Sequence, residues 1–595
     1  MQYNKQSSIE VEHTPVEFLL LADNIGWGIQ SHGYEVKQHL AESSKWLKEN
    51  DPERLNSPLW QLGWFDQFPF VGSRALGPYK IAHEVRLSGF SVQVVDLVTQ
   101  MDIATLRKVL DKYVGENTLA VGISNTFIAK IPNRLNVRPS YTNLDPFHGD
   151  DVKEKYGATA DDTQAYVGFL PHGPEIDELF VEHLKKINPN TKLMKGGAFT
   201  NRKSDYKHVD IVNIGYGDIT VPEILTELKD GDVEQLPKNN FGLPYKEDVF
   251  SKQDVKHSTM KWHEDDCLYP GEILPIEISR GCIFKCKFCS FALNGKQKGE
   301  GIRCMDLIRD ELVHNYENFG IEHYWIVDDT FNDDHDKMID FMEMSKTLPF
   351  KLKFACYIRL DLLYANRNRT PSQAEIIRDA GIVHVQFGVE TTNPDSAVDI
   401  GKGLNPMTQF EYMRELKNGV WSHVDMGSGM IVGLPSDTKE SIKEMANFLV
   451  SDQNPMIGTA VRPLSITPEG FDERTDSEFQ KNWQEYGYEP TDKYMNGKDM
   501  EPEIKKFFHA QFLYKNKHGI TFVDGLKFSN RLNKRLMKHG KLWPNMLFKS
   551  FGLPYKEGDM ITPEEFDEFD LDTVRRINEI EIKRYNKYIE QVLKK

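Results

Sequence analysis

Short apolar runs alternate with helix-like segments along much of this chain, and that alternation constrains its fold more than any other feature. A helix-like stretch from Ile81 to Ser88 is ended by Gly89. Further helices are expected at 175–187 and from Pro222. The apolar runs around them are residues 17–23, 91–98, 119–124, 192–197 and 209–215. Short buried strands separated by helices predict an α/β fold, with a parallel sheet that helices cover on both faces.

A second alternation of the same kind starts at residue 272. The expected strands are 272–279, 323–329, 351–358, 383–390 and 424–435. Gly320, Gly381 and Gly419 end the helices between them. The first of these helices has one apolar face, made of Met305, Ile308, Leu312, Tyr316 and Phe319. Repeated strand-helix units predict a closed or partial parallel barrel of the TIM type, whose active site lies at the carboxyl ends of its strands.

With 595 residues, the chain is too long for a single hydrophobic core, so several domains are expected. Residues 236–271 are polar, contain proline and lack periodicity, which predicts a linker. We therefore expect a doubly wound, flavodoxin-like sheet in 1–235 and a barrel in 272–465. A mainly helical C-terminal segment, 466–595, is expected to close one end of the barrel. Two long polar segments of the first domain, about 24–70 and 128–170, are expected to be lids or insertions.

The overall charge of the chain limits the classes of partner. A formal net charge of −17 argues against a surface built to neutralise phosphates, so nucleic acid is an unlikely partner. The N-terminus has no basic stretch followed by an apolar one, and nowhere do 18 apolar residues follow one another. These features predict a cytoplasmic protein without a membrane span.

Three of the six cysteines lie in one short loop, GCIFKCKFCSF, as Cys282, Cys286 and Cys289. Six cysteines in so long a chain cannot form a disulfide framework, so the cluster indicates metal ligation. A structural zinc site needs four ligands, and Cys304, Cys267 or a nearby histidine could supply the fourth. A 4Fe-4S cluster held by three thiolates instead leaves one iron free to bind a small molecule. The loop directly follows an expected strand, as a barrel active site requires.

The segment EISRGCIFKCKFCSF resembles the cluster loop of the radical S-adenosylmethionine (SAM) superfamily. The resemblance implies a partial (β/α)6 barrel in which Cys282, Cys286 and Cys289 ligate the 4Fe-4S cluster. In that family the open iron binds the amino and carboxylate groups of SAM. An electron from the reduced cluster, supplied by a reductant such as flavodoxin or ferredoxin, then splits the sulfonium to give a 5'-deoxyadenosyl radical. Phe288 occupies the aromatic position that lies by the adenine.

Four later segments resemble the following strands of the same family. WIVDDTF implies that Asp328 contacts the methionyl amine, and CYIRLD carries Arg359 of the third strand. QFGVET implies that Glu390 meets polar groups of ribose or methionine, and IVGLPSDT places Gly433 near the adenine. From the residues alone, Arg359 and Glu390 could also form a barrel ion pair, and Asp328 could be a loop carboxylate. The aspartates after Asp328 in DDTFNDDHD lack calcium-loop spacing, so we expect them in a solvated loop.

The N-terminal sheet resembles the cobalamin-binding domain of a large radical SAM subgroup. INPNTKLMKGGAFT carries a double glycine after the fourth strand, and VDIVNIGYGDIT carries an acidic glycine turn after the fifth. The resemblance implies that Gly196, Gly197, Gly215 and Gly217 contact a corrin, whereas from spacing alone they could be tight turns. The chain has no D-x-H-x-x-G motif, so no histidine ligand to cobalt is predicted.

These features together predict a radical SAM enzyme that abstracts hydrogen from an unidentified small molecule or peptide. If cobalamin binds, methylcobalamin would deliver a methyl group to the substrate radical, and a second SAM would remethylate the cofactor. One alternative is a cobalamin-independent rearrangement, cyclisation or oxidation. Another is a non-enzymatic iron-sulfur redox sensor, against which Arg359, Glu390 and the GLP segment weigh, since a sensor needs no SAM pocket. The sequence does not identify a catalytic residue.

Overall fold

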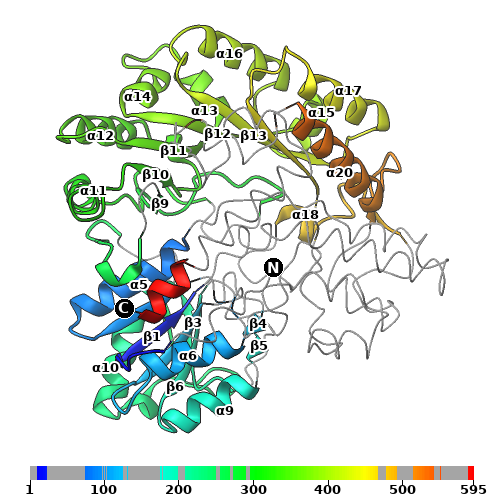
Figure 1. Ribbon diagram of the computed structural model, residues 1–595. Helices are drawn as coiled ribbons and strands as arrows, with labels where there is room; N and C mark the ends of the chain where they lie inside the picture. The colour runs from blue at the N-terminus through cyan, green and yellow to red at the C-terminus, as the bar shows by residue number, and fades with distance from the viewer. Residues whose placement is uncertain are drawn as a thin grey trace.

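A computed structural model gives the fold of the chain (Figure 1). The residues that it describes are 10–22, 74–96, 98, 101, 103–124, 130–131, 175–176, 178–197, 208–248, 255–268, 272–289, 295–464, 466, 477–491, 514–539, 541, 550 and 587–594. The insertions expected at 24–70 and 128–170 lie almost entirely outside these residues. Two parallel sheets of six strands dominate the described part.

The first sheet has the strand order β2-β1-β3-β6-β7-β8, and every neighbouring pair is parallel. Its strands are β1 (Phe18–Leu21), β2 (Val92–Val95), β3 (Ala120–Ser124), β6 (Lys192–Gly197), β7 (Ile211–Gly215) and β8 (Tyr245–Asp248). Its helices are α5 (Leu76–Leu87), α6 (Ile103–Tyr113), α9 (Glu178–Ile187) and α10 (Thr220–Asp230). The order confirms the doubly wound, flavodoxin-like prediction. The chain adds β2 on one side of β1 and then crosses back to add β3 on the other side, so the order of strands reverses there.

Strand β1 contributes side chains to two cores, one on each face of the first sheet. In β1, Phe18 and Leu20 pack in the cluster that includes α5 and α10. Leu19 and Leu21 pack in the cluster that includes α6 and α9. Because successive side chains of a strand point to opposite faces, a run of four apolar residues is what a sheet covered on both sides requires.

The second sheet runs in chain order from β9 to β14, again with every pair parallel. Its strands are β9 (Ile273–Ile276), β10 (His323–Ile326), β11 (Lys353–Ile358), β12 (Ile382–Glu390), β13 (Asp425–Val432) and β14 (Gly458–Pro463). The helices around it are α11 (Met305–Phe319), α12 (His335–Lys346), α13 (Leu360–Ala365), α14 (Gln373–Asp379), α15 (Pro394–Asp399), α16 (Pro406–Asn418), α17 (Lys439–Val450) and α20 (Phe522–Lys538). The edges β9 and β14 do not pair among the described residues, so the barrel is partial.

Short elements complete the described chain. They are β4 (Lys130–Ile131), β5 (Glu175–Ile176), η5 (Val233–Gln235), η6 (Glu264–Asp266), η7 (Phe331–Asp333), α18 (Glu478–Lys481), β15 (Glu489–Pro490) and β16 (Tyr514–Lys515). The expected linker, 236–271, is more than a linker, because β8 within it pairs with β7 as the edge of the first sheet. The sequence of β8, YKED, has no apolar run and is only partly buried, which is why periodicity did not indicate a strand.

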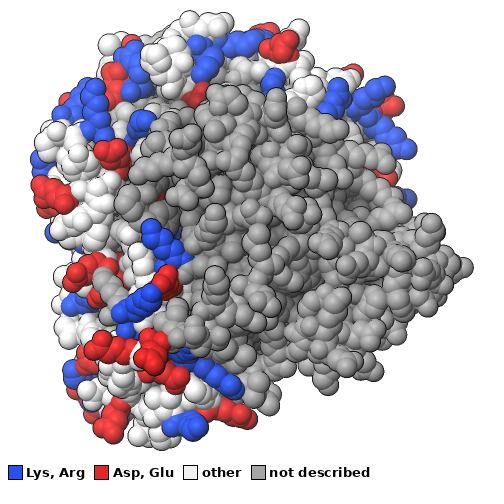
Figure 2. Space-filling view, in the orientation of Figure 1, with Lys and Arg blue, Asp and Glu red and all other residues white. Residues whose placement is uncertain are grey.

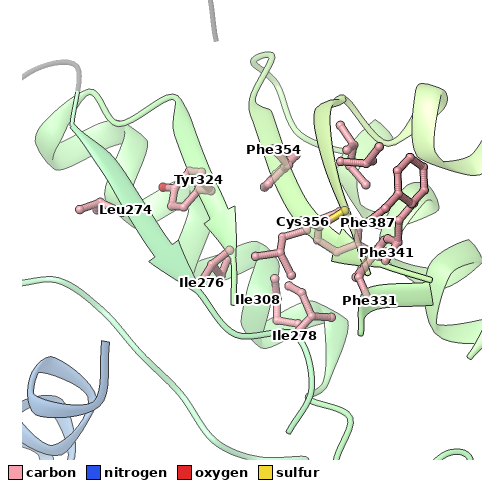
Figure 3. Close-up of a cluster of buried hydrophobic side chains, with 14 of the residues drawn as sticks. Leu274, Ile276, Ile278, Ile308, Tyr324, Phe331, Phe341, Phe354, Cys356 and Phe387 are labelled. Carbon is pink, nitrogen blue, oxygen red and sulfur yellow. The ribbon is translucent and has the colours of Figure 1, made fainter. Parts of the chain in front are cut away.

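The barrel core lies between its strands and helices (Figure 3). Ile308 on α11, Phe341 on α12 and Phe354 on β11 are all nearly inaccessible to solvent. Figure 3 shows Cys356 among these aromatic and aliphatic side chains. Gly320 ends α11 in a left-handed conformation, with φ 65°, which glycine adopts without a steric penalty.

The C-terminal part of the chain packs on both sheets rather than only on the barrel. Helix α20 lies against β14 and hydrogen-bonds it through Asn533, whose Nδ2 donates to the carbonyl oxygen of Val461 at 2.9 Å. The terminal helix, residues 587–594, instead packs into the first sheet through Ile589 and three further buried residues, Tyr588, Val592 and Leu593. The expectation that the whole segment closes one end of the barrel was therefore wrong for this helix. Its apolar positions gave no indication of which domain they would contact.

Substituting Ile589 with alanine should destabilise the first domain. The side chain is fully buried in the core of the first sheet, and truncating a buried isoleucine costs about 3 kcal/mol because burial is lost and a cavity forms. Glu590 on the same helix is exposed, so Glu590→Ala is the matched control and should change stability by less than about 0.5 kcal/mol. Thermal unfolding measures both, and equal melting temperatures for the two variants would contradict the docking of this helix.

Charged side chains of both signs mix on the face of the molecule shown in Figure 2. On the face shown in Figure 2, lysines and arginines lie among aspartates and glutamates, without a broad region of one sign. Within the described ranges, none of the helices combines the length and the apolar character needed to cross a membrane.

Candidate functional site

The three-cysteine loop lies where the barrel prediction requires it, just beyond the carboxyl end of β9. Cys282 is buried, while Cys286 and Cys289 are half-buried. The backbone N–H of Cys289 donates to the carbonyl oxygen of Cys286 at 3.0 Å, which closes a tight turn. Phe288 lies half-buried within that turn. None of the three cysteines forms a disulfide.

Two polar groups approach the sulfurs from neighbouring strands. Arg359, at the end of β11, donates from Nη1 to Cys286 Sγ at 3.3 Å, and its guanidinium stacks over the ring of Phe284 at 3.7 Å. The hydroxyl of Thr330 lies 3.3 Å from Cys282 Sγ. Burial raises the pKa of the Cys282 thiol, so a metal that replaces its proton would relieve the cost of a buried thiolate. A cationic donor beside a thiolate stabilises its negative charge.

The other cysteines do not complete a four-ligand zinc site. In the described part of the chain, no three histidine, cysteine, aspartate or glutamate side chains converge as ligands of a single ion. Cys267 packs in the core of the first sheet, and Cys304 is the N-cap residue of α11. The trio in the loop instead suits a cluster in which each thiolate binds a different iron.

Asp328 has a structural environment. Its Oδ1 accepts hydrogen bonds from the backbone N–H groups of Ile278 and Ser279, at 2.8 and 2.9 Å. Its Oδ2 accepts from the Ser279 hydroxyl at 2.6 Å and lies 3.5 Å from Lys337 Nζ. These bonds hold the backbone that leads from β9 into the cysteine loop. The carboxylate predicted to contact the SAM amine is therefore already engaged by the chain itself.

Asp329, one of the aspartates expected in a solvated loop, is better placed for a cationic ligand. It is half-buried, and its carboxylate accepts no hydrogen bond from the residues that the structure describes. Burial, followed by the charge of Asp328, raises its pKa to about 7. Adjacent strand-end residues point in opposite directions, and only the local geometry decides which of two aspartates faces the barrel opening.

The remaining acidic run is not a solvated loop, so that expectation was wrong. Asp333 and Asp334 are buried. Asp333 Oδ1 pairs with Lys337 Nζ at 2.6 Å. Asp334 caps α12, because its Oδ1 accepts from the backbone N–H groups of Asp336 and Lys337. These carboxylates fix the start of α12.

Glu390 has an unusual backbone. Its φ is 71°, a left-handed conformation that costs a residue with a Cβ about 1–3 kcal/mol and is concentrated at functional sites. Burial raises the pKa of its carboxyl group, against the opposing charges of Lys402 and Arg359. Arg359 forms its ion pair with Asp361, through Nε and Oδ1 at 2.9 Å, and not with Glu390. Arg359 and Glu390 therefore do not form the barrel ion pair that the residues alone allowed.

Gly433 lies in the turn after β13, under the C-terminal segment. Its φ is 91°, and its N–H donates to Asp437 Oδ2 at 2.9 Å. The Tyr488 hydroxyl donates to its carbonyl oxygen at 3.0 Å. A Cβ at this position would lie 2.9 Å from the Tyr514 hydroxyl. Glycine is required here for backbone conformation and for the close approach of this tyrosine.

The four glycines of the first sheet have different environments. Gly197 and Gly215, at the carboxyl ends of β6 and β7, have left-handed φ values of 123° and 84°. Gly196 precedes Gly197 on β6, and a Cβ there would lie 3.2 Å from the Cβ of Asn213 on β7. A Cβ at Gly217 would lie 2.6 Å from Ile81 Cδ1, so close packing of α5 accounts for that glycine.

The end of the first sheet meets the cysteine loop directly. Arg280, two residues before Cys282, forms an ion pair with Asp218 and stacks over the Tyr216 ring at 4.2 Å. Its Nε also donates to Glu277 Oε1 at 2.6 Å. Asp218 and Tyr216 belong to the turn after β7, so the carboxyl ends of both sheets face a common region. In doubly wound sheets and in barrels alike, ligands bind at those ends.

Comparisons with known proteins agree with this arrangement. Residues 276–449 match the model of the radical SAM superfamily. An uncharacterized methyltransferase of Pyrococcus horikoshii, PH0819, is 25% identical over 283 residues, which is 44% of this chain and 59% of that protein. The hopanoid C-2 methylase of Rhodopseudomonas palustris is 26% identical over 188 residues, 31% of this chain and 34% of the methylase. The aligned parts thus span less than two thirds of either relative.

A solved structure extends the similarity to nearly the whole chain. It is the radical SAM methyltransferase TsrM from Kitasatospora setae, with cobalamin and a 4Fe-4S cluster bound. The TM-score is 0.55 at 13% sequence identity, over 96% of this chain and 99% of TsrM. At that identity the match establishes a shared fold.

Proposed function

We propose that this chain, in which residues 276–449 are a radical SAM domain, is a cobalamin-dependent radical SAM methyltransferase acting on carbon. The radical SAM domain implies a 4Fe-4S cluster and SAM, and the cluster supplies the electron that cleaves SAM. The observation that carries the proposal is the direct contact between the turn after β7 and Arg280 at the start of the cysteine loop. A cofactor at the end of the first sheet would lie close to the cluster.

The cysteine loop has the properties needed to hold the cluster. Cys282, Cys286 and Cys289 are the proposed ligands, with Thr330 and Arg359 oriented toward two of the sulfurs. Such outer contacts orient ligands and tune the potential of a metal site. Asp329 is the proposed contact for the positive charge of SAM, and Asp328 orders the backbone around it. Glu390 and Arg359 would bind the remaining polar groups of SAM.

Gly197 and Gly215 support a cobalamin site, because left-handed glycines at strand ends let a backbone approach a bulky ligand closely. Cobalamin would supply a carrier for the methyl group between SAM and substrate. Named methyltransferases among the relatives and the fold shared with TsrM support the same assignment. Gly217 gives no support, since helix packing explains it. A cobalamin-independent radical SAM reaction is the second candidate, and this packing is the observation that favours it.

Cobalamin loading decides between the two candidates. Protein purified without oxygen in the presence of hydroxocobalamin should retain the cofactor, seen by visible absorption after gel filtration. Gly215→Ala should lose it, because a Cβ would both strain the backbone and occupy the contact surface. Gly89 also has a left-handed φ, 85°, but lies in the turn after α5, so Gly89→Ala is the matched control and should load normally. Failure of the unaltered protein to retain cobalamin would refute the proposal.

The affinity for SAM should depend on pH through Asp329. Because the pKa of this carboxyl group is about 7, it is largely neutral below that pH and gains its negative charge above it. SAM carries a sulfonium cation, so its affinity should rise as the pH increases through about 7. Asp329→Asn should bind SAM several-fold more weakly at alkaline pH and show a flatter profile, as measured by equilibrium dialysis. Titration of the SAM amine affects the unaltered protein and Asp329→Asn equally. Identical dependences of SAM affinity on pH in the two proteins would therefore contradict the role of Asp329.

A further inference from the structure

The interior of the barrel contains an arginine, Arg462, that pairs with none of the described residues. Arg462 lies on β14, where parallel register places it beside Ile431 of β13. The preceding residues in the same row are Ala460 and Gly429, also neighbours in register. Met430 and Val461, at the alternate positions, are buried in the core beneath the helices. Arg462 is exposed and therefore lies on the face opposite the helices, which is the inner face of the barrel.

Tyr357 shows that the inner face is concave at this point. It lies on β11, separated from β14 by two intervening strands, a distance of roughly 14 Å along a flat sheet. Even so, Tyr357 and Arg462 interact electrostatically, which requires the two groups to lie near each other. The two side chains must face each other across the interior.

Both groups are hydrogen-bond donors that lack an acceptor among the residues the structure describes. Within the described ranges, no carboxylate or carbonyl oxygen accepts a hydrogen bond from Arg462 or from the Tyr357 hydroxyl, and Arg462 has no ion-pair partner. Burial raises the pKa of Tyr357 to about 12, so its hydroxyl stays protonated at neutral pH. An exposed guanidinium and a protonated hydroxyl that face the same interior can both donate hydrogen bonds to an anionic group of a ligand.

The surrounding wall is apolar and leaves room for a planar group. Trp325 on β10 packs edge-on against Tyr357, with ring centroids 4.8 Å apart, and both rings are half-buried. On the other side of the interior, a Cβ added to Gly429 would meet only Glu390 Oε2, at 3.9 Å. Small residues opposite an aromatic pair form a slot for a flat ligand.

We propose that Arg462 and Tyr357 bind the carboxylate of the substrate, and that the Trp325–Tyr357 pair packs against its planar apolar body. The proposal rests on the proposed function and names its substrate class as a small aromatic or similarly flat organic acid. Tyr357 lies two residues before Arg359, which contacts Cys286, so the anchored acid sits next to the reaction centre. Arg462 and Tyr357 would bind the end of the substrate that does not react, and would thereby position its reacting end.

Equilibrium binding to the cluster-loaded enzyme tests the proposal with two probes of the same shape. The probes are 3-phenylpropanoate and the neutral 3-phenylpropanamide, measured by anaerobic calorimetry. The unaltered enzyme should bind the acid at least about 10-fold more tightly than the amide, the gain expected from a charge-assisted hydrogen bond. Arg462→Gln should remove this preference, and Arg462→Lys should keep part of it, because lysine has the charge but not the planar fork. Tyr357→Phe should lower the affinity for the acid and leave the affinity for the amide unchanged.

The controls separate this proposal from its alternatives. Arg378 lies exposed on α14, so Arg378→Gln should keep the full preference for the acid. Absence of any preference in the unaltered enzyme, or its persistence in Arg462→Gln, would overturn the proposal. So would a loss of SAM affinity in Arg462→Gln that matched the loss of acid binding, because Arg462 would then serve the SAM carboxylate. SAM consumption is assayed separately. A preference for the acid in an enzyme that never consumes SAM would refute the proposed function but would still support this binding site.

Discussion

Cys286→Ala is expected to lose the iron-sulfur cluster and, with it, on the order of 1,000-fold or more of SAM consumption, the scale seen when a group essential to the chemistry is removed. Cys286 lies in the middle of the three-cysteine loop, and Arg359 donates a hydrogen bond to its sulfur. Two remaining thiolates would leave an additional iron without a protein ligand, so the cluster would be lost rather than merely altered. Iron and sulfide analysis after anaerobic reconstitution measures the loading directly.

Two cysteines outside the loop provide controls for this result. Cys304→Ala changes a half-buried thiol at the start of α11, and Cys356→Ala changes a fully buried one in the barrel core. Both should load the cluster normally, although the second should lose some stability because it leaves a small cavity. If Cys304→Ala removed the metal as completely as Cys286→Ala, or if zinc replaced iron in all preparations, the cluster assignment would be wrong.

Much of the fold follows from the sequence, because buried parallel strands are short uninterrupted apolar runs. FLLL, AVGIS and IVNIG could hardly be anything else between helices ended by glycine. Two of the four edge strands, β8 and β14, did not give this pattern. YKED is polar and only partly buried, and GTAVRP ends in an arginine and a proline. Edge strands are paired on one side only, so a parallel sheet tolerates polar residues there.

The site could be predicted only where the spacing of residues along the chain determines the chemistry. Three cysteines in one loop are local, so their pattern is visible without a fold. The choice between Asp328 and Asp329 depends on which way each residue of a strand end points, and a shift of one position reverses it. The importance of Arg462 depends on the curvature that brings β14 opposite Tyr357. Long-range geometry of this kind leaves no signal in composition or periodicity.

Lys337→Met should be among the most destabilising single substitutions in the barrel. Lys337 is fully buried between Asp328 and Asp333, at 3.5 and 2.6 Å, and also donates to the Ser279 hydroxyl at 2.9 Å. Removing one member of a buried ionic group leaves the other charges uncompensated, which costs about 3–5 kcal/mol. The midpoint of urea unfolding of the cluster-free protein, followed by circular dichroism, measures this loss. Since Asp328 orders the start of the cysteine loop, cluster loading should also fall.

The pH dependence distinguishes lost charge compensation from lost packing. Burial already raises the pKa of Asp328 against the charge of Lys337, and removal of the lysine should raise it further. The folded variant then binds protons more tightly than its unfolded chain, so its stability falls as the pH rises, and its deficit should be smaller at mildly acidic than at mildly alkaline pH. Lys346→Met on the same helix removes an exposed ion pair with Glu343, and should cost less than about 1 kcal/mol at either pH. A deficit in Lys337→Met that did not change with pH would mean that Lys337 stabilises the barrel by packing, and that Asp328 does not depend on its charge.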